Sequence, residues 1–457
     1  MQSFEIDKSD LLRVKTALEG DDAELANVLK EYHASEIALL FEKLPKEAHE
    51  RIINILPADI ASEVISEIDE EHHPEELLIN LHPEKRSEIV EELDYDDATD
   101  IISQLGEDEQ QEILEDIDQE DATSIRALLK YDEDTAGGLM NSEIIKVNIN
   151  LSKKEALDEI IRQSEEMEEF NTVYVVDDSG ILQGILSIKS IIKARADARV
   201  KSLVETNFVY VKADLDQEDV AGLISQYNLT AIPVVDDNMM LLGRITVDDI
   251  IDVIERESTE DILKFSGVSE DEELSGNWKD AVKSRLPWLI INLATAYLAA
   301  SIIRHFTTTV AEIPILAAYM TIIAGMGGNS ATQALAVTVR RISLSNLTDK
   351  QAYNTVLKEF LVGMLNGAAN GLIVFFIALF YDSDPWLGLV LFLAMTGNLI
   401  VAGLTGASIP LILKRVGIDP AVASSIIITT FTDCAGFLLP LWFATQILVP
   451  HLKHLHP

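Results

Sequence analysis

A stretch in the middle of the chain decides the fold there, and it reads Val173-Tyr174-Val175-Val176-Asp177-Asp178-Ser179-Gly180. Gly184-Ile185-Leu186-Ser187 follows it after three residues. The β-branched and aromatic residues, the polar turn that ends in glycine and the second apolar run predict two strands joined by a turn. Helical stretches flank this pair, from Lys153 to Glu166 before it and from Ile188 to Ala196 after it.

The same order recurs later in the chain. Ala231-Ile232-Pro233-Val234-Val235-Asp236-Asp237-Asn238 is followed by Gly243-Arg244-Ile245-Thr246, and a helical stretch from Gln217 to Tyr227 precedes it. The sequence therefore predicts two β-α-β-β-α units in tandem. They resemble a pair of CBS domains, a ligand-sensing module, and we expect the two copies over residues 136–200 and 201–256.

The resemblance to CBS pairs also implies a candidate ligand. Such pairs often hold an adenosine nucleotide with a Thr or Ser and an Asp three residues later. The second copy has Thr246 and Asp249 at these positions, whereas the first copy has Ser187 and Ser190. A nucleotide would therefore be held by Thr246 and Asp249.

Short helices arranged in a repeat precede the CBS-like units. Windows that start at Leu44, Leu81 and Leu105 share apolar residues at the same offsets, and the last two windows abut, so that one repeat unit extends from Leu81 to Gln104. Paired short helices of this kind stack into a solenoid with a continuous core. We expect an all-α repeat domain over residues 1–135, acting either as a spacer or as a regulatory domain.

Charge divides the chain into two unequal parts. The 457 residues include 77 acidic and 35 basic residues, a formal charge of −42, and positions 1–280 alone carry −45. This charge excludes nucleic-acid binding through phosphates, which needs a basic surface. The single cysteine, Cys434, excludes an intrachain disulfide. No signal-peptide pattern precedes the acidic part, so we expect it in the cytoplasm.

The remainder, residues 281–457, predicts an all-α membrane domain with five spans. Each apolar stretch can cross ~30 Å of hydrocarbon. The spans are expected at Pro287–Ile303, Ile313–Val339, Val356–Phe380, Trp386–Leu413 and Pro420–Val449. Basic residues gather before span one and in the loops after spans two and four, which predicts a cytoplasmic N-terminus and a C-terminus outside the cell membrane.

Six polar side chains lie within these predicted spans: Asn329, Gln333, Asn366, Asn370, Asn398 and Asp433. Asp433 is the only carboxylate well inside a span, and no Lys or Arg within the spans neutralises it. It is either a protonated, hydrogen-bonded acid or part of a cation site. Two copies of Asp433 in a homodimer would supply the one or two carboxylates with which Mg²⁺ is often held while it keeps several waters.

A long amphipathic helix is expected to connect the sensor to the membrane. From Asp248 the apolar positions Ile251, Ile254, Ile262 and Phe265 recur with a helical period up to Ser266-Gly267, and the other face is acidic. We expect this connecting helix and its linker over residues 248–280.

The whole chain resembles the MgtE family of magnesium channels, with the same order of domains. The motifs that carry the resemblance are Glu133-Asp134-Thr135-Ala136-Gly137-Gly138-Leu139-Met140, Thr259-Glu260-Asp261-Ile262, Gly325-Met326-Gly327-Gly328-Asn329-Ser330, Gly417-Ile418-Asp419-Pro420-Ala421, and Thr432-Asp433 with Gly436. The resemblance implies that Asp433 is the pore carboxylate, with Asn329, Gly325 and Gly328 beside the ion, and that the connecting helix is a plug. One position departs from the family, which usually has glycine where Ala331 stands. We expect the methyl group of Ala331 either to narrow the contact that span two makes with its neighbours or to alter which ion is selected.

The expected function is passive Mg²⁺ influx through a homodimeric pore that cytosolic Mg²⁺ closes. At low Mg²⁺ the acidic surfaces repel each other, and bound Mg²⁺ bridges them. The expected regulatory ligands are Asp97, Asp100, Asp214, Asp216, Asp248, Asp249, Asp252, Glu255, Glu257 and Glu260.

Two other functions remain open at this point. The chain could transport another divalent cation such as Co²⁺, or it could be a membrane-anchored CBS sensor that reports to a partner. An enzyme is not expected, because the sequence has no Gly-x-Ser-x-Gly, His-Glu-x-x-His or Gly-x-x-x-x-Gly-Lys motif.

Overall fold

The computed structural model of the chain describes residues 8–41, 43–69, 72–164, 170, 172–268, 278–343 and 348–455. The predicted end of the helix at Glu166 and the side chains of Asp261, Phe265, Pro420 and Ala421 lie outside what is described. The chain divides into two compact units, Met1–Arg256 and Glu257–Pro457, which are treated separately below.

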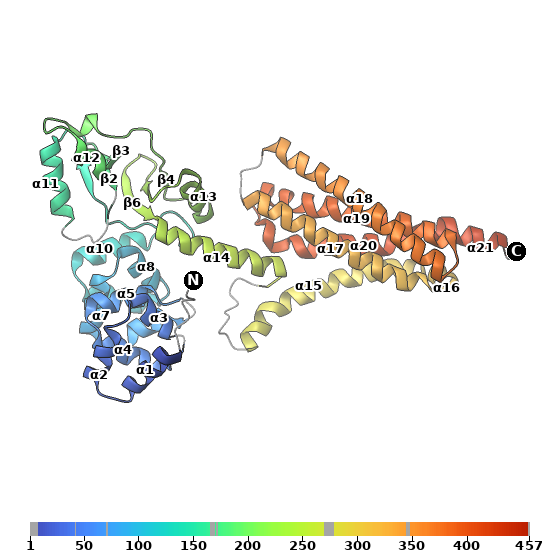
Figure 1. Cartoon of the computed structure of the whole chain (residues 1–457), viewed down its shortest axis with the longest axis horizontal. Coiled ribbons are helices and arrows are strands. Elements are labelled where there is room, and N and C mark those ends of the chain that lie inside the picture. The colour runs from blue at the N-terminus through green and yellow to red at the C-terminus, as the bar shows by residue number, and fades with distance from the viewer. Residues whose placement is uncertain are drawn as a thin grey trace. The chain divides into compact units, whose positions relative to one another are not determined.

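Short helices build the first part of the N-terminal unit, drawn in blue and cyan in Figure 1. They are α1 (Lys8–Leu18), α2 (Asp22–Leu29), α3 (Ala34–Phe41), α4 (Lys46–Ile55), α5 (Ala58–Ser66), α6 (Pro74–Asn80), α7 (Pro83–Glu92), α8 (Tyr95–Ser103), α9 (Glu107–Asp116) and α10 (Gln119–Leu128). The interval from the start of α7 to the start of α9 equals the interval from the start of α8 to the start of α10. Leu81 and Leu105, the starts of two predicted repeat windows, are separated by the same interval. The predicted helical repeat is therefore confirmed.

One apolar core runs through these ten described helices, and an ion-pair clamp joins two repeats. The core extends without interruption from Val14 in α1 to Ile125 in α10. Arg86 of α7 is almost fully buried, and its guanidinium donates hydrogen bonds to Glu112 at 2.8 Å and to Asp116 at 2.9 Å, both in α9. The contact joins the same helix of successive repeats, as stacking of a solenoid requires.

Two three-stranded sheets follow, each made by one β-α-β-β-α unit. The first unit is β1 (Lys146–Asn148), α11 (Lys153–Gln163), β2 (Thr172–Val176), β3 (Leu182–Ser187) and α12 (Ile188–Lys193). The second is β4 (Val211–Lys212), α13 (Gln217–Tyr227), β5 (Ala231–Val235), β6 (Leu241–Thr246) and α14 (Val247–Ser266). A short 3₁₀ turn at Val200–Ser202 lies between them. The predicted tandem units are confirmed.

The two sheets share one pattern of pairing. The first strand of each unit pairs parallel with the second, and the second pairs antiparallel with the third, with Val173 opposite Leu186 and Ile232 opposite Ile245. A shared apolar cluster that includes Tyr174 and Val235 joins the two β-α-β-β-α units. The sheets therefore act as one module, and α14 both completes that module and continues as the expected connecting helix.

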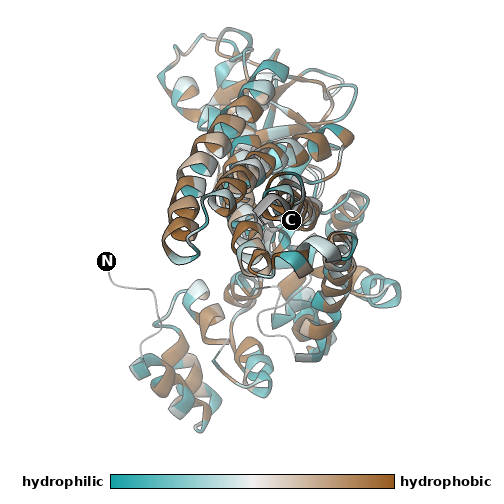
Figure 2. Ribbon diagram, turned by 90° about the vertical axis from the view of Figure 1, so that its right-hand side faces the viewer, coloured by the Kyte–Doolittle hydropathy of each residue, from teal (hydrophilic) through white to brown (hydrophobic). Residues whose placement is uncertain are grey.

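Long helices make up the C-terminal unit. They are α15 (Trp278–His305), α17 (Leu316–Ser343), α18 (Asp349–Tyr381), α19 (Pro385–Val416) and α20 (Pro420–Phe443), with the shorter α16 (Thr307–Glu312) and α21 (Val449–Leu455) and a π-helical stretch, η3, at Ala444–Leu448 between α20 and α21. Figure 2 colours hydrophobic residues brown, and brown turns recur along the long helices near the C-terminus.

Four apolar segments within the described residues are long and apolar enough to cross a membrane: Trp278–His305, Asp349–Tyr381, Pro385–Val416 and Ile426–Leu452. α17 is as long as α15, with 28 residues, but it is not among the four. The expected five long helices are therefore present, and the one of lower hydropathy is the expected span two.

Glycine allows α18 and α19 to pack closely. A Cβ atom added to Gly363 or Gly403 would collide with the backbone carbonyl of Leu399 or Glu359, respectively, and one on Gly367 would lie 2.8 Å from the Cα of Thr396. Backbones at this separation gain van der Waals contact where lipid provides no hydrophobic driving force. These glycines are thus part of the helix packing.

Candidate functional site

One face of α17 carries a strip of polar side chains and glycine. Thr321, Gly325, Asn329, Thr332 and Gln333 are exposed and recur at helical spacing, whereas the opposite face is buried. Added Cβ atoms on Gly325 and Gly328 would meet no other atom within 4 Å. The three pore residues expected on this helix therefore lie on or beside the face that this chain leaves uncovered.

Asp433 stands on α20, which packs against α17. Gly436, one turn beyond Asp433, makes the closest contact, because an added Cβ there would lie 2.7 Å from the Cα of Ala324. Asp433 is half-buried and forms no ion pair or hydrogen bond with any residue that the structure describes. The neighbouring Thr432 is buried, and its hydroxyl bonds within α20 to the carbonyls of Ile428 and Thr429.

Ala331, the position that departs from the family, lies on the packed face of α17. It is fully buried in a cluster with Leu335, Ala402 and Ile428. An added Cβ on Gly406 of α19 would lie 2.7 Å from the carbonyl oxygen of Ala331. The extra methyl group is thus a packing feature and does not belong to the polar strip.

A second site is built where α8 meets the start of α14. Asp96 and Asp97 of α8 share their surroundings with Asp249 of α14, and Asp94 precedes α8. Burial and the charge of Asp249 hold the pKa of Asp96 well above its ordinary value. Burial, followed by the charges of Asp94 and Asp249, raises the pKa of Asp97 to about 7. These four aspartates, which we call the acid cluster, carry charges that the fold forces together.

Hydrogen bonds fix two members of the acid cluster. Asn141 donates its Nδ2 hydrogen to Asp96 Oδ1 at 3.1 Å. The Thr246 hydroxyl and backbone N–H both donate to Asp249 Oδ2, at 2.6 and 3.0 Å. These donors lower the pKa of Asp249, but burial dominates and raises it. Asp96 was not among the ligands predicted from the sequence, because nothing in the run Asp94-Tyr95-Asp96-Asp97 shows which carboxylate turns inward.

The acid cluster suits a hydrated cation. No group of three or more His, Cys, Asp or Glu side chains within the described ranges is arranged to hold a metal ion directly. Mg²⁺ keeps several waters and is often bound by only one or two carboxylates. Asp96 is buried and Asp97 and Asp249 are partly buried. Carboxylates that repel one another in such surroundings would be stabilised by this ion, so the residues present fit Mg²⁺ held largely through its water shell.

The other predicted ligands of the N-terminal unit differ in their placement. Asp252 lies on α14 one turn after Asp248 and is exposed as a whole, but partial burial of its carboxyl group raises its pKa. Asp248 and Glu255 are exposed on the same helix. Asp214 is exposed, and Asp216 caps α13 by accepting a hydrogen bond from the backbone of Glu218.

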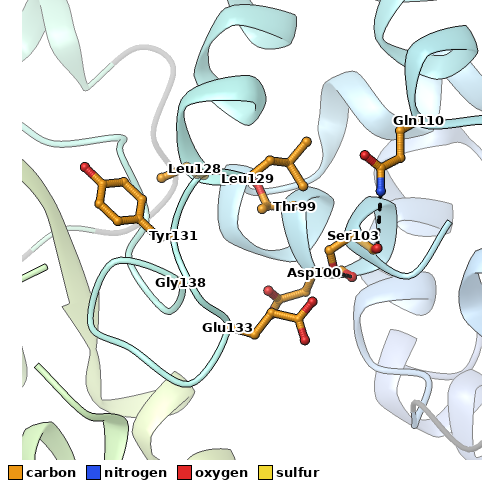
Figure 3. Close-up of a pocket in the computed structure, with 9 residues that line it drawn as sticks. All are labelled: Thr99, Asp100, Ser103, Gln110, Leu128, Leu129, Tyr131, Glu133 and Gly138. Carbon is orange, nitrogen blue, oxygen red and sulfur yellow. Dashed lines mark hydrogen bonds between the residues drawn. The ribbon is translucent and has the colours of Figure 1, made fainter. Parts of the chain in front are cut away.

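Asp100 lines a cavity of about 250 Å³ at the junction between the helical repeats and the sheets. Figure 3 shows it with Glu133, from the loop after α10, and the cavity is also lined by Thr99, Ser103, Gln110, Leu128, Leu129, Tyr131 and Gly138. Two carboxylates and several hydroxyl or amide groups make this cavity polar. It lies beside the motif found in the sequence from Glu133 to Met140.

Glu257 and Glu260, the remaining predicted ligands, belong to the C-terminal unit. Glu260 forms an ion pair with Lys264 one turn further along α14. Lys264 also lies 3.4 Å from Asp419, in the turn before α20. The end of the connecting helix is therefore joined by charge to the start of the helix that carries Asp433.

Three family models match separate parts of the chain. The model described as MgtE, divalent cation transporter, matches residues 320–443, the MgtE intracellular N domain matches residues 32–134, and the CBS domain matches residues 136–197 and 200–256.

Similar proteins and solved structures agree with these models. The chain is 32% identical to magnesium transporter MgtE of Thermus thermophilus over 435 residues, which cover 94% of this chain and 96% of that protein. It is 30% identical to magnesium transporter MgtE of Bacillus subtilis over 439 residues, covering 96% and 97%. The N-terminal half is similar to a crystal structure of the cytosolic domain of the Mg²⁺ channel MgtE in complex with ATP, with a TM-score of 0.51, 35% identity and coverage of 53% of this chain and 99% of that one.

Proposed function

The chain belongs to the MgtE family of magnesium transporters, and on that premise we propose that it conducts Mg²⁺ into the cell through a pore lined by α17 and α20 of two copies. The observation that carries this proposal is the Asp433 carboxylate, which has no partner among the described residues and stands beside a helix with an uncovered polar strip. Such a carboxylate is costly within a membrane unless an ion or water meets it.

A homodimer supplies what one chain lacks. Each chain offers a single carboxylate, and a twofold axis would bring two together. Two carboxylates suit a Mg²⁺ ion that keeps most of its waters. The driving force is the membrane potential, which contributes about 4.6 kcal/mol per 100 mV for an ion of charge +2.

We propose that cytosolic Mg²⁺ closes this pore by binding to the acid cluster. The segment 1–280 carries −45 per chain, so compact packing of two such parts is opposed by repulsion unless cations intervene. Mg²⁺ that binds more tightly to the compact state shifts the population toward it. Because α14 carries Asp249 at one end and Lys264 near the other, the cluster and the start of α20 are linked through one helix.

The test is Mg²⁺ flux into liposomes that contain the purified protein with Asp433→Ala or Asp433→Asn. We expect no flux from the first variant and little from the second, with both still dimeric on gel filtration. Cys434→Ala, which truncates the next side chain of the same helix, is the matched control and should conduct normally. Normal flux through folded Asp433→Ala would reject the pore. Competition by Co²⁺ in the same assay decides whether Mg²⁺ is the preferred ion.

We propose that all five long helices span the membrane, which places the C-terminus outside. The four segments that meet the length and hydropathy criteria would return the chain to the cytoplasm, so α17 decides the orientation. A tag after Pro457 should react with an impermeant reagent on intact cells, and a tag before Met1 should not. Equal reaction at the two ends would show that α17 does not cross.

We also propose an adenosine nucleotide as a ligand of the sheet module. Support comes from the similar cytosolic domain that was solved in complex with ATP. Thr246 and Asp249 already bond to each other, and Asp249 belongs to the acid cluster, so nucleotide binding there would compete with Mg²⁺. Calorimetric titration with ATP should give weaker binding in Thr246→Val; unchanged binding would place the nucleotide elsewhere.

A further inference from the structure

Asn398 is a buried amide in the middle of α19 that reaches across to another helix. It is fully buried, and its Nδ2 donates a hydrogen bond of 2.7 Å to the backbone carbonyl of Ile323 in α17. The Asn398 Oδ1 atom is buried too and accepts no hydrogen bond within the described part of the chain. Because a backbone carbonyl can only accept, the amide must present its nitrogen to α17.

Packing alone does not explain this amide. A buried acceptor without a donor is unfavourable, and an apolar side chain of similar size would avoid that loss. The favourable half of the interaction is the hydrogen bond to α17. The hydrogen bond from Asn398 therefore positions α17, which an apolar side chain that only filled the space would not do.

Gly327 provides the space for this hydrogen bond. A Cβ atom added to Gly327 would collide with Asn398 Nδ2. In a regular helix the N–H of residue 327 donates to the carbonyl of residue 323, so the amide of Asn398 joins the same acceptor from outside the helix. This contact fixes both the rotation of α17 about its axis and its position along α19.

The contact lies at the level of the pore carboxylate. Ala324, the next residue after Ile323, touches Gly436 of α20, which is one turn from Asp433. On α19, Gly397 admits Leu439 of α20, since an added Cβ would lie 2.9 Å from Leu439 Cδ1. Three helices therefore meet here, and a displacement of α17 would change the separation between its polar strip and Asp433.

We infer that Asn398 is a positioning residue whose hydrogen bond to Ile323 sets which divalent cation the segment Gly325–Asn329 admits. The inference rests on the proposed function, because it requires α17 and α20 to line the pore. Mg²⁺ demands near-ideal octahedral geometry and gives up water reluctantly. A lining held at a fixed distance favours this ion, and a lining that shifts accepts competitors such as Co²⁺ more readily.

The experiment measures the ratio of Mg²⁺ to Co²⁺ flux in liposomes for Asn398→Leu. We expect the ratio to fall at least about threefold, since the lining loses its fixed position while Asp433 is retained. Asn370→Leu is the matched control, because Asn370 is another amide within a span, and its Nδ2 donates a hydrogen bond to the carbonyl of Asn366 in its own helix. It should leave the ratio unchanged.

A second pair of variants separates the hydrogen bond from packing. Gly327→Ala should lower the ratio as Asn398→Leu does, because the methyl group displaces the amide. Gly327→Ala combined with Asn398→Ala removes the collision, so it should recover thermal stability but not the ratio. A wild-type ratio in the double variant, or in folded Asn398→Leu, would overturn the inference. If Asn398→Leu does not fold, the Gly327 pair decides.

Asp433→Ala in the same liposomes keeps the two proposals apart. If that variant conducts, the pore assignment fails and the inference falls with it. If it is silent while the Asn398 and Gly327 variants keep the wild-type ratio, only the role of Asn398 is rejected.

Discussion

The acid cluster and Asp433 are two carboxylate sites that the chain builds in opposite ways. At α8 and α14 one chain brings together Asp94, Asp96, Asp97 and Asp249, where burial and then the neighbouring aspartate charges raise the pKa values of Asp96, Asp97 and Asp249. On α20 one chain offers Asp433 alone, beside a helix face that it leaves uncovered. The first site has several carboxylates within one chain, whereas the second offers one carboxylate per chain.

This difference between the two sites matches the two roles that we propose for them, sensing of Mg²⁺ by the acid cluster and conduction of Mg²⁺ at Asp433. Crowded carboxylates are stabilised by a nearby cation, because its charge relieves their repulsion. A conducting site must bind an ion well enough to admit it but weakly enough to release it. We therefore expect variants of the cluster to change how the protein responds to Mg²⁺, and variants of Asp433 to change whether it conducts at all.

The largest effect on the sensing side is expected from Asp96→Asn, Asp97→Asn and Asp249→Asn together. This variant removes the crowded charges that Mg²⁺ would relieve, so conductance and protease sensitivity of the N-terminal unit should no longer change between zero and millimolar Mg²⁺. Electrophysiology and limited proteolysis of the full-length protein measure the two responses.

The matched control is Glu107→Gln, Asp108→Asn and Glu115→Gln, which neutralises three exposed acids of α9. It changes the net charge equally and should keep the full Mg²⁺ response. A cluster variant that still closes over the same Mg²⁺ range would show that sensing lies elsewhere, for instance at Asp100 and the polar cavity beside it.

A smaller, graded effect is expected from pH. Metal ligands must be deprotonated, and the pKa of Asp97 is raised from its ordinary 3.8 to about 7. At pH 6 most Asp97 side chains are protonated, so the Mg²⁺ concentration that gives half-maximal protection from protease should be roughly tenfold higher than at pH 8. Asp97→Asn should remove most of this dependence. A midpoint that is independent of pH in the wild type would contradict the buried cluster.

Without Mg²⁺ the same raised pKa values act on stability in a defined direction. The folded protein holds protons that the unfolded chain releases, so this stabilisation is complete below the ordinary pKa of 3.8 and is lost as the pH rises through about 7. Added Mg²⁺ should restore stability at pH 8 more than at pH 6. The thermal midpoint of the full-length protein at the two pH values measures it.

The sequence predicted the order of elements well, because the order depends on local patterns. The repeat found in the sequence recurs as pairs of helices that start at equal intervals, and the strands fall where the alternation of apolar residues changes period. α17 was the harder case. Its polar strip of Asn329, Thr332 and Gln333 lowers its hydropathy, so the feature that suits it to a pore also weakens its signal as a span.

Tertiary contacts were beyond sequence reasoning. Asp96 and Asp97 are neighbours in sequence, yet only Asp96 bonds to Asn141, 45 residues away. Asn398 is recognisable in the sequence as a polar residue within a span, but its hydrogen bond to a backbone carbonyl 75 residues away leaves no pattern in the sequence. Such contacts depend on which faces of two helices meet. Hydrophobic periodicity identifies the buried face of each helix but not the helix that packs against it.

The most direct test of the contrast between a sensing site within one chain and a shared conducting site is Mg²⁺ flux through mixed dimers. Wild-type and Asp433→Ala copies with different affinity tags are co-expressed, and dimers that carry both tags are isolated and placed in liposomes. If two Asp433 carboxylates hold one ion, the mixed dimer should conduct no better than the dimer of two Asp433→Ala copies. Flux at about half the wild-type rate would show that each chain conducts by itself and would contradict the shared pore.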